Sequence, residues 1–246
     1  MVNFVGLDNF SFLIFKKPTF WIVVYNSALF AVSFVIIKAF VGFVIAHLLQ
    51  NLPAKAQRKW RAALLIPWVI PPAMSVLAWL WLFDPSFSAL NWVLKRVGVG
   101  PVFWLGEVTW ARSAVIIVSV WIGAPFFMVM YLAALKSVPE QLYEADEIDG
   151  ATWWQKLRFV TLPMTRNIIA ITMLFSLIGS SGAFNVIQIL TNGGPQRIHS
   201  PLGPSRVGML GGDIPLGASI SLFTLPILAL AAIYILRNVR ERGSEA

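Results

Sequence analysis

The sequence contains no cysteine and only two histidines among its 246 residues. The absence of cysteine excludes disulfide bonds, thiol nucleophiles and cysteine-ligated metal sites. The histidines, His47 and His199, lie far apart, and neither a His-Glu-x-x-His pattern nor a glycine-rich phosphate-binding loop is present. We therefore expect a protein that is not an enzyme and that binds no metal or cofactor directly.

Charged residues are also scarce, at 12% of the chain, whereas 58% of the residues are hydrophobic and the mean hydropathy is +0.75. Soluble domains carry about 25% charged residues. A water-soluble fold could not bury so much apolar surface, so we expect a lipid bilayer around the chain. The net charge of +8 does not indicate nucleic-acid binding, because the basic residues gather between apolar runs instead of forming one face.

Five stretches are long and apolar enough to cross a bilayer, which takes a helix of about 20 residues. They are residues 21–49, 62–83, 113–135, 167–190 and 216–236. We predict an all-α integral membrane protein with about five transmembrane helices in one domain over residues 21–236. Three prolines in the second stretch predict a kink near Ser75. The one charge in the first stretch, Lys38, is expected to extend towards the Gln50 end of its helix and reach the membrane surface there. A role in a pore or in ion coupling is the alternative.

The distribution of basic residues predicts the orientation. Eleven lysines and arginines follow the first, third and fifth stretches, and seven lie on the opposite side. The positive-inside rule places the first set in the cytoplasm. Residues 237–246 then form a cytoplasmic tail, and residues 1–20 form an external segment that lacks the features of a signal peptide.

The connection between the third and fourth stretches is acidic and rich in helix-capping residues. Ser137 with Glu140, and Thr152 with Gln155, each have the spacing of a capping box. Gly150 stands between them, where a left-handed residue commonly ends a helix. The sequence therefore predicts two short helices joined at Gly150, on the cytoplasmic face.

Two interpretations of this loop remain open. Leu142, Ala145 and Ile148 recur every three residues and predict a narrow apolar stripe among acidic side chains. Such a stripe suits docking into a groove of a partner protein. The alternative is a solvated hairpin that only connects two spans.

The same loop resembles the EAA loop of permease subunits from binding-protein-dependent ABC importers. The family pattern runs E-A-A-x-x-D-G-A, then a spacer, then I-x-L-P. The matching residues are Glu144, Ala145, Asp149, Gly150, Ala151, Leu162 and Pro163. Asp146 replaces the usual second alanine, and we expect it to face water. Val160 replaces the usual isoleucine, and Pro163 is expected to end the second loop helix.

Three further stretches are similar to carbohydrate-uptake permeases of the maltose and glycerol-phosphate type. They are GLDNF at 6–10, PWVIPPAMSVLAWLWLFDP at 67–85 and FNVIQILTNGGP at 184–195. The resemblance spans nearly the whole chain. It implies a subunit of a bacterial or archaeal plasma membrane that forms half of the translocation path for a sugar or sugar-like solute.

The resemblance also implies partners. These would be a second permease subunit in a heterodimer, two ATPase subunits that hold ATP and Mg, and an extracytoplasmic solute-binding protein. Residues 137–163 would be the coupling loop that meets the ATPase. Two departures stand out: the family usually has one more span before the GLDNF segment, and residues 196–210 do not follow its pattern.

A solute path through apolar helices needs hydrogen-bonding side chains. Ser181, Asn185 and Gln188 follow i, i+4, i+7 and would share one face of a helix over residues 167–190. They are the candidate path residues, and hydrogen bonding between helices is the alternative role. A self-contained secondary transporter or channel is the alternative function, although only Lys38 is charged within a span and no internal repeat is visible.

Overall fold

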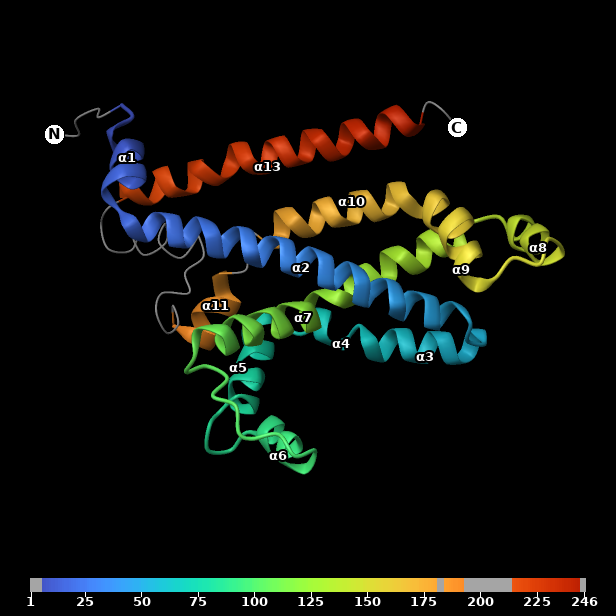
Figure 1. Cartoon of the computed structure of the whole chain (residues 1–246), viewed down its shortest axis with the longest axis horizontal. Helices are drawn as coiled ribbons and strands as arrows, with labels where there is room; N and C mark the ends of the chain where they lie inside the picture. Colours follow the sequence, from blue (N-terminus) through green and yellow to red (C-terminus); the bar gives the residue numbers. More distant parts are fainter. Residues whose placement is uncertain (1–5, 181–183, 193–213, 244–246) are drawn as a thin grey trace.

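The computed structural model describes residues 6–180, 184–192 and 214–243, and every regular element in these ranges is helical (Figure 1). Four long helices run along the longest axis of the molecule (Figure 1). They are α2 (Pro18–Gln50), α7 (Val108–Lys136), α10 (Leu162–Ser180) and α13 (Ile214–Gly243). The short helix α1 (Asp8–Ser11) and the π-helical turn η1 (Phe12–Lys16) precede α2.

Within the described ranges, three helices are long and apolar enough to cross a membrane, namely Phe20–Gln50, Val108–Lys136 and Trp153–Gly179. A fourth crossing results if the bent pair Ala54–Val69 and Pro72–Leu82 counts as one span. Helix α13 contains the fifth stretch predicted from the sequence. The fold is that of an all-α integral membrane protein.

The second predicted span is not one helix. It comprises α3 (Ala54–Leu64), α4 (Ile66–Val69) and α5 (Pro72–Leu82), with a bend of 91° after Val69. The break lies at Ile70 and Pro71, several residues before the kink predicted near Ser75. Ile70 adopts an extended backbone with ψ 135°, because the proline that follows it disfavours the helical region.

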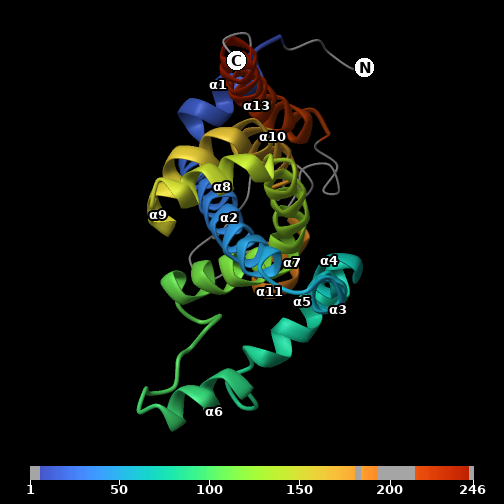
Figure 2. The same cartoon turned by 90° about the vertical axis from the view of Figure 1, so that its right-hand side faces the viewer.

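Helices α2 and α7 run parallel and form the most extensive helix pair in the described structure (Figures 1 and 2). Glycines allow their backbones to approach closely, as is common between membrane helices. A Cβ atom at Gly42 would lie 2.3 Å from Phe127 Cβ, and one at Gly123 would lie 2.6 Å from Lys38 Cε. Towards the N-terminal ends of both helices, Arg112 Nη2 donates a hydrogen bond to Asn26 Oδ1 at 2.8 Å.

The Lys38 side chain points in a different direction from the one predicted. Its side chain lies against Gly123 within the α2–α7 pair, and its ammonium group sits 5.1 Å from the centre of the Phe34 ring. Phe34 is one turn closer to the N-terminus of α2, so the side chain points away from the Gln50 end. The prediction that Lys38 extends towards that end is wrong, because helical side chains tilt towards the N-terminus of their helix.

The fourth predicted span also divides differently. The chain is helical without interruption from α9 (Trp153–Lys156) through a π-helical turn, η2 (Leu157–Thr161), into α10. Pro163 therefore does not end the helix as predicted. The π-helical turn directly before it shifts the local hydrogen bonding, so the missing N–H group is accommodated. Residues 184–190 belong to a separate helix, α11 (Phe184–Thr191), which packs on α5 and α7.

A lobe between α5 and α7 contains the amphipathic helix α6 (Ala89–Arg96). Asn91 fixes the returning chain to this helix with three hydrogen bonds. Its side-chain amide bonds both backbone groups of Val102, at 3.0 and 3.1 Å, and its Oδ1 accepts from Trp104 Nε1 at 3.0 Å. The lobe is thereby held as a unit on one side of the helix bundle (Figure 2).

Candidate functional site

The candidate coupling loop lies at one end of the molecule. Its two short helices are α8 (Glu140–Ile148) and α9, and the C-terminal ends of α2, α7 and α13 are at the same end (Figure 1). The basic residues that follow the first, third and fifth apolar stretches therefore gather at this end. The fold thus unites the segments that the charge distribution assigns to one side of the membrane.

Gly150 makes the turn between the two short helices. Its φ is +70°, which is the left-handed conformation predicted for it. The N–H of Gly150 donates to the carbonyl of Glu147 at 3.2 Å, and the N–H of Ala151 donates to that of Asp146 at 2.9 Å. These are the two bonds of a Schellman motif, which satisfies the last carbonyls of α8. The predicted helix end at Gly150 is confirmed.

The second predicted capping box is present and the first is not. The N–H of Thr152 donates to Gln155 Oε1 at 2.7 Å, and the N–H of Gln155 donates back to Thr152 Oγ1 at 3.4 Å. At the start of α8, Pro139 is the N-cap residue and no side chain caps the helix. Ser137 instead donates to the carbonyl of Ala134 at 2.7 Å, because the end of α7 offers an acceptor.

Two side-chain contacts hold the loop in shape. Lys156 Nζ in α9 lies 3.0 Å from Glu147 Oε1 in α8. The hydroxyl groups of Tyr143 and Thr161 are 3.1 Å apart and share a hydrogen bond between α8 and η2. The loop is consequently braced both within itself and against the helix that follows it.

The surface of the loop combines acidic and apolar side chains. Leu142 and Ala145 of the predicted stripe are exposed, and Ile148 is 87% exposed. The acidic residues Glu144 and Asp149 are exposed beside this stripe. A well-braced element with an exposed apolar stripe is suited to contact another protein.

The residues that match the EAA pattern lie on this loop and at the start of the next helix. Glu144 and Ala145 are in α8, Asp149, Gly150 and Ala151 form the turn, and Leu162 and Pro163 begin α10. All are exposed except Ala151, which is half-buried.

Asp146, the residue that replaces the second alanine of the pattern, is half-buried instead of facing water. Its Oδ2 is out of contact with solvent and has no hydrogen-bond partner among the described residues.

The structure describes two of the three candidate path residues. Ser181 lies outside the described residues, and Asn185 and Gln188 belong to α11. Gln188 Nε2 donates to Asn192 Oδ1 at 2.7 Å at the end of this helix. The predicted common face requires one helix over residues 167–190, whereas α10 ends at Ser180 and α11 begins at Phe184.

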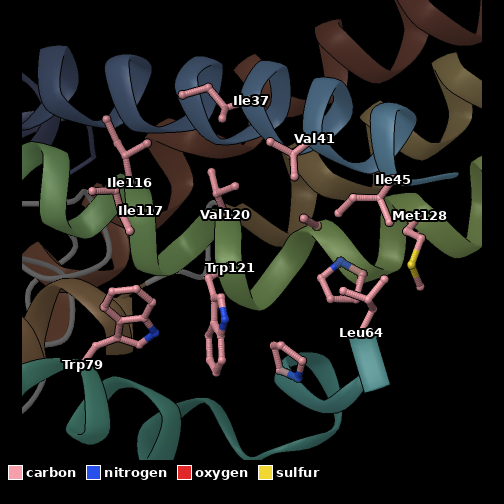
Figure 3. A pocket seen from close by; sticks show the side chains of 13 residues that line it. Ile37, Val41, Ile45, Leu64, Trp79, Ile116, Ile117, Val120, Trp121 and Met128 are labelled. Atoms are coloured by element: carbon pink, nitrogen blue, oxygen red, sulfur yellow. The ribbon is translucent and has the colours of Figure 1, made fainter. Parts of the chain in front are cut away.

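A cavity of about 420 Å³ opens between α2, α7 and the bent α3–α5 segment (Figure 3). Apart from two tryptophans the lining is aliphatic, proline or methionine: Ile37, Val41, Ile45, Leu64, Pro67, Trp79, Ile116, Ile117, Val120, Trp121, Ala124, Pro125 and Met128. The rings of Trp79 and Trp121 meet edge to face with centres 5.7 Å apart. Sugar hydroxyls would lose hydrogen bonds here, so the cavity does not offer the chemistry of a sugar site.

One contact of the loop has no signal in the sequence. Trp153 Nε1 in α9 donates a hydrogen bond to His47 Nε2 near the end of α2, at 2.9 Å. The two rings also meet edge to face with centres 5.5 Å apart. The residues are 106 positions apart, so no local pattern could predict the pair.

Comparison with known proteins decides the family. The profile of the family described as binding-protein-dependent transport system inner membrane component matches residues 7–239. The chain belongs to this family. Membership confirms the resemblance to these permeases that the sequence showed, and with the apolar helices it makes the protein a multi-pass membrane component.

Several relatives of this permease are named for the transport of sugars or sugar derivatives. The trehalose/maltose permease protein MalF of Thermococcus litoralis is 31% identical over 240 residues, covering 97% of this chain and 81% of the relative. The sulfoquinovosyl glycerol permease protein SmoG of Agrobacterium fabrum is 33% identical, covering 78% and 62%. The chain spans about half, 49%, of the maltose/maltodextrin permease protein MalF of Klebsiella aerogenes, to which it is 33% identical.

Solved structures support the fold. A bacterial ABC transporter that imports the acidic polysaccharide alginate aligns with a TM-score of 0.82 at 19% identity, over 97% of this chain and 84% of the other. An inward-facing structure of the MetNI methionine transporter aligns with a TM-score of 0.60 at 21% identity, over 92% and 98%. At these identities the likeness concerns the fold of this permease.

Proposed function

We propose that this permease is one of two membrane subunits of an ATP-driven importer for a saccharide or a saccharide derivative. ATP and Mg would be held by a separate pair of ATPase subunits, and an external solute-binding protein would deliver the solute. The names of the related proteins support the solute class, since they include permeases for maltose, trehalose and sulfoquinovosyl glycerol.

The coupling loop carries the ATPase assignment. It is capped, braced by the Glu147–Lys156 ion pair, and exposes an apolar stripe with acidic neighbours. A rigid, amphipathic projection can transmit a displacement that a flexible connection would absorb. We therefore assign Glu144, Ala145, Asp149, Gly150, Ala151, Leu162 and Pro163 to the contact with the ATPase.

The orientation follows from where charge gathers. The loop, the start of α3 and the C-terminal end of α13 lie together at one end (Figure 1). Basic residues are concentrated in these segments, so this end, with the C-terminal tail, faces the cytoplasm.

The solute path remains a proposal based on α11. This helix packs against α5 and α7 at the end opposite the coupling loop (Figure 1). Its two amide residues, Asn185 and Gln188, are candidates for hydrogen bonds to sugar hydroxyls, and Ser181 precedes them in the chain. The partner permease would complete the path.

Co-purification from cells that express the neighbouring genes tests the function. The wild-type chain should retain an ATPase and a second permease, and proteoliposomes should import solute only with ATP and the binding protein. Glu144→Lys reverses an exposed acidic charge, and Gly150→Pro cannot adopt φ +70°, so both should lower ATPase retention and uptake.

The same change at Asp8 provides the control, because Asp8 is exposed on α1, far from the loop (Figure 1). Asp8→Lys should leave ATPase retention unchanged. If the wild-type chain imports solute without any ATPase, the proposed function is wrong.

A further inference from the structure

The hydrogen bond between Trp153 and His47 joins the candidate coupling loop to a helix that is not its neighbour in the chain. Covalent connections link the loop to α7 on one side and to α10 on the other. Helix α2 precedes the loop by about a hundred residues. Any displacement of the loop therefore reaches α2 only through non-covalent contacts.

The chemistry of the pair makes the contact directional. An indole N–H can only donate, and the 2.9 Å distance to Nε2 requires that this imidazole nitrogen be the unprotonated acceptor. The edge-to-face contact of the rings adds a second geometric constraint. Together they fix the rotation of α9 relative to the end of α2.

His47 is itself anchored in the helix bundle. Its ring stacks on Phe43 one turn earlier in α2, with centres 6.3 Å apart and planes 13° apart. Phe43 in turn meets Tyr131 of α7 edge to face at 6.0 Å. Aromatic contacts therefore continue from α9 through His47 and Phe43 of α2 to Tyr131 of α7.

Two other hydrogen bonds at this end of the molecule do not involve the loop. Gln57 Nε2 donates to the carbonyl of Leu49 at 2.8 Å, and Lys136 Nζ donates to Gln57 Oε1 at 2.7 Å. These bonds connect α2, α3 and α7 with one another. Among the described residues, Trp153 and His47 make the polar contact between the loop helices and α2.

We propose that Trp153 and His47 are positioning residues that tie the coupling loop to α2, so that α2 moves with the loop. The inference rests on the proposed function, since it assumes that an ATPase displaces the loop. Without the tie, the ATPase still docks and hydrolyses ATP, but less of the movement reaches the α2–α7 pair. The protein would then transport less solute for each ATP consumed.

Trp153→Phe tests the tie, because it keeps an aromatic ring and removes the N–H donor. The complete transporter is reconstituted in proteoliposomes with its binding protein, and solute uptake and ATP hydrolysis are measured in the same sample. Removing one hydrogen bond changes an equilibrium by roughly threefold to tenfold. We expect a fall of that size in solute transported per ATP, with ATPase co-purification unchanged.

Trp154→Phe is the matched control. Trp154 is 59% exposed and Trp153 is 58% exposed, and both are in α9. The control should keep the wild-type transport ratio. An equal fall in both variants, or no fall in Trp153→Phe, would overturn the tie.

A double-mutant cycle adds a test of the pairing. His47→Phe keeps a ring against Phe43 but cannot accept the bond, so it should lower the ratio as Trp153→Phe does. The double variant should be no worse than either single variant, because both remove the same interaction. Additive losses would contradict the pairing, and loss of ATPase retention in Trp153→Phe would show a docking residue instead. Absence of ATPase from the wild-type complex would refute the proposed function on which the tie rests, whereas an unchanged transport ratio of Trp153→Phe in an intact complex refutes the tie alone.

Discussion

Replacing Gly42 by alanine should destabilise the pairing of α2 and α7. The new Cβ would lie 2.3 Å from Phe127 Cβ and 3.0 Å from the backbone nitrogen of Met128. Carbon atoms in contact sit about 3.5–4.0 Å apart, so the two helices must separate or rotate. Overpacking of this kind costs about 1–3 kcal/mol, whereas the higher helix propensity of alanine returns about 1 kcal/mol. We expect a net loss of up to about 2 kcal/mol.

Two other glycines isolate the packing contribution. A Cβ at Gly179 of α10 would meet no atom within 4 Å, so Gly179→Ala changes helix propensity alone. At Gly123 the nearest atoms are the end of the flexible Lys38 side chain, which can move aside, so Gly123→Ala should be intermediate. The difference between Gly42→Ala and Gly179→Ala therefore measures the overpacking cost of about 1–3 kcal/mol.

Thermal and denaturant unfolding of the purified chain in detergent provides the measurement. From the most to the least stable variant, the order should be Gly179→Ala, Gly123→Ala and Gly42→Ala. Equal stability of Gly42→Ala and Gly179→Ala would refute the close approach of α2 and α7, because the propensity change is the same in both.

Three further changes have local outcomes. Asn91→Ala removes three hydrogen bonds that hold Val102 and Trp104, so amide exchange of Val102 should accelerate in the α6 lobe alone, and unchanged exchange would contradict the described clamp. Gly150→Ala places a side chain at φ +70°, which costs about 1–2 kcal/mol, and should increase amide exchange at the end of α8; full protection there would rule out the left-handed turn. Asp146→Ala removes a carboxylate oxygen that is buried without a described partner, so the melting temperature should stay level or rise, and a clear fall would indicate a missed interaction.

Features set by neighbouring residues were predictable from the sequence. The turn at Gly150 and the capping box of Thr152 and Gln155 depend on hydrogen bonds that span three to five residues. The apolar runs likewise identified the regions of α2 and α7, because bilayer thickness sets the length of a spanning helix.

Features set by competition or by distant contacts were not predictable. Ser137 has the spacing of a cap, but the carbonyl of Ala134 takes its hydroxyl group. Pro163 has the character of a helix breaker, but the preceding π-helical turn accommodates it. Hydropathy alone does not show that α10 and α11 are separate helices, or that Lys38 packs on Gly123.

The bend between α4 and α5 has a consequence for what surrounds it. In an α-helix, the carbonyls of Pro67 and Trp68 would accept from the residues four positions on, which are Pro71 and Pro72 and carry no N–H. Hydrocarbon cannot satisfy such carbonyl groups, so irregular backbone at membrane depth needs protein or water beside it. Pro71 and Pro72 are exposed in the single chain. We therefore expect this corner to face protein or water at membrane depth, and not lipid.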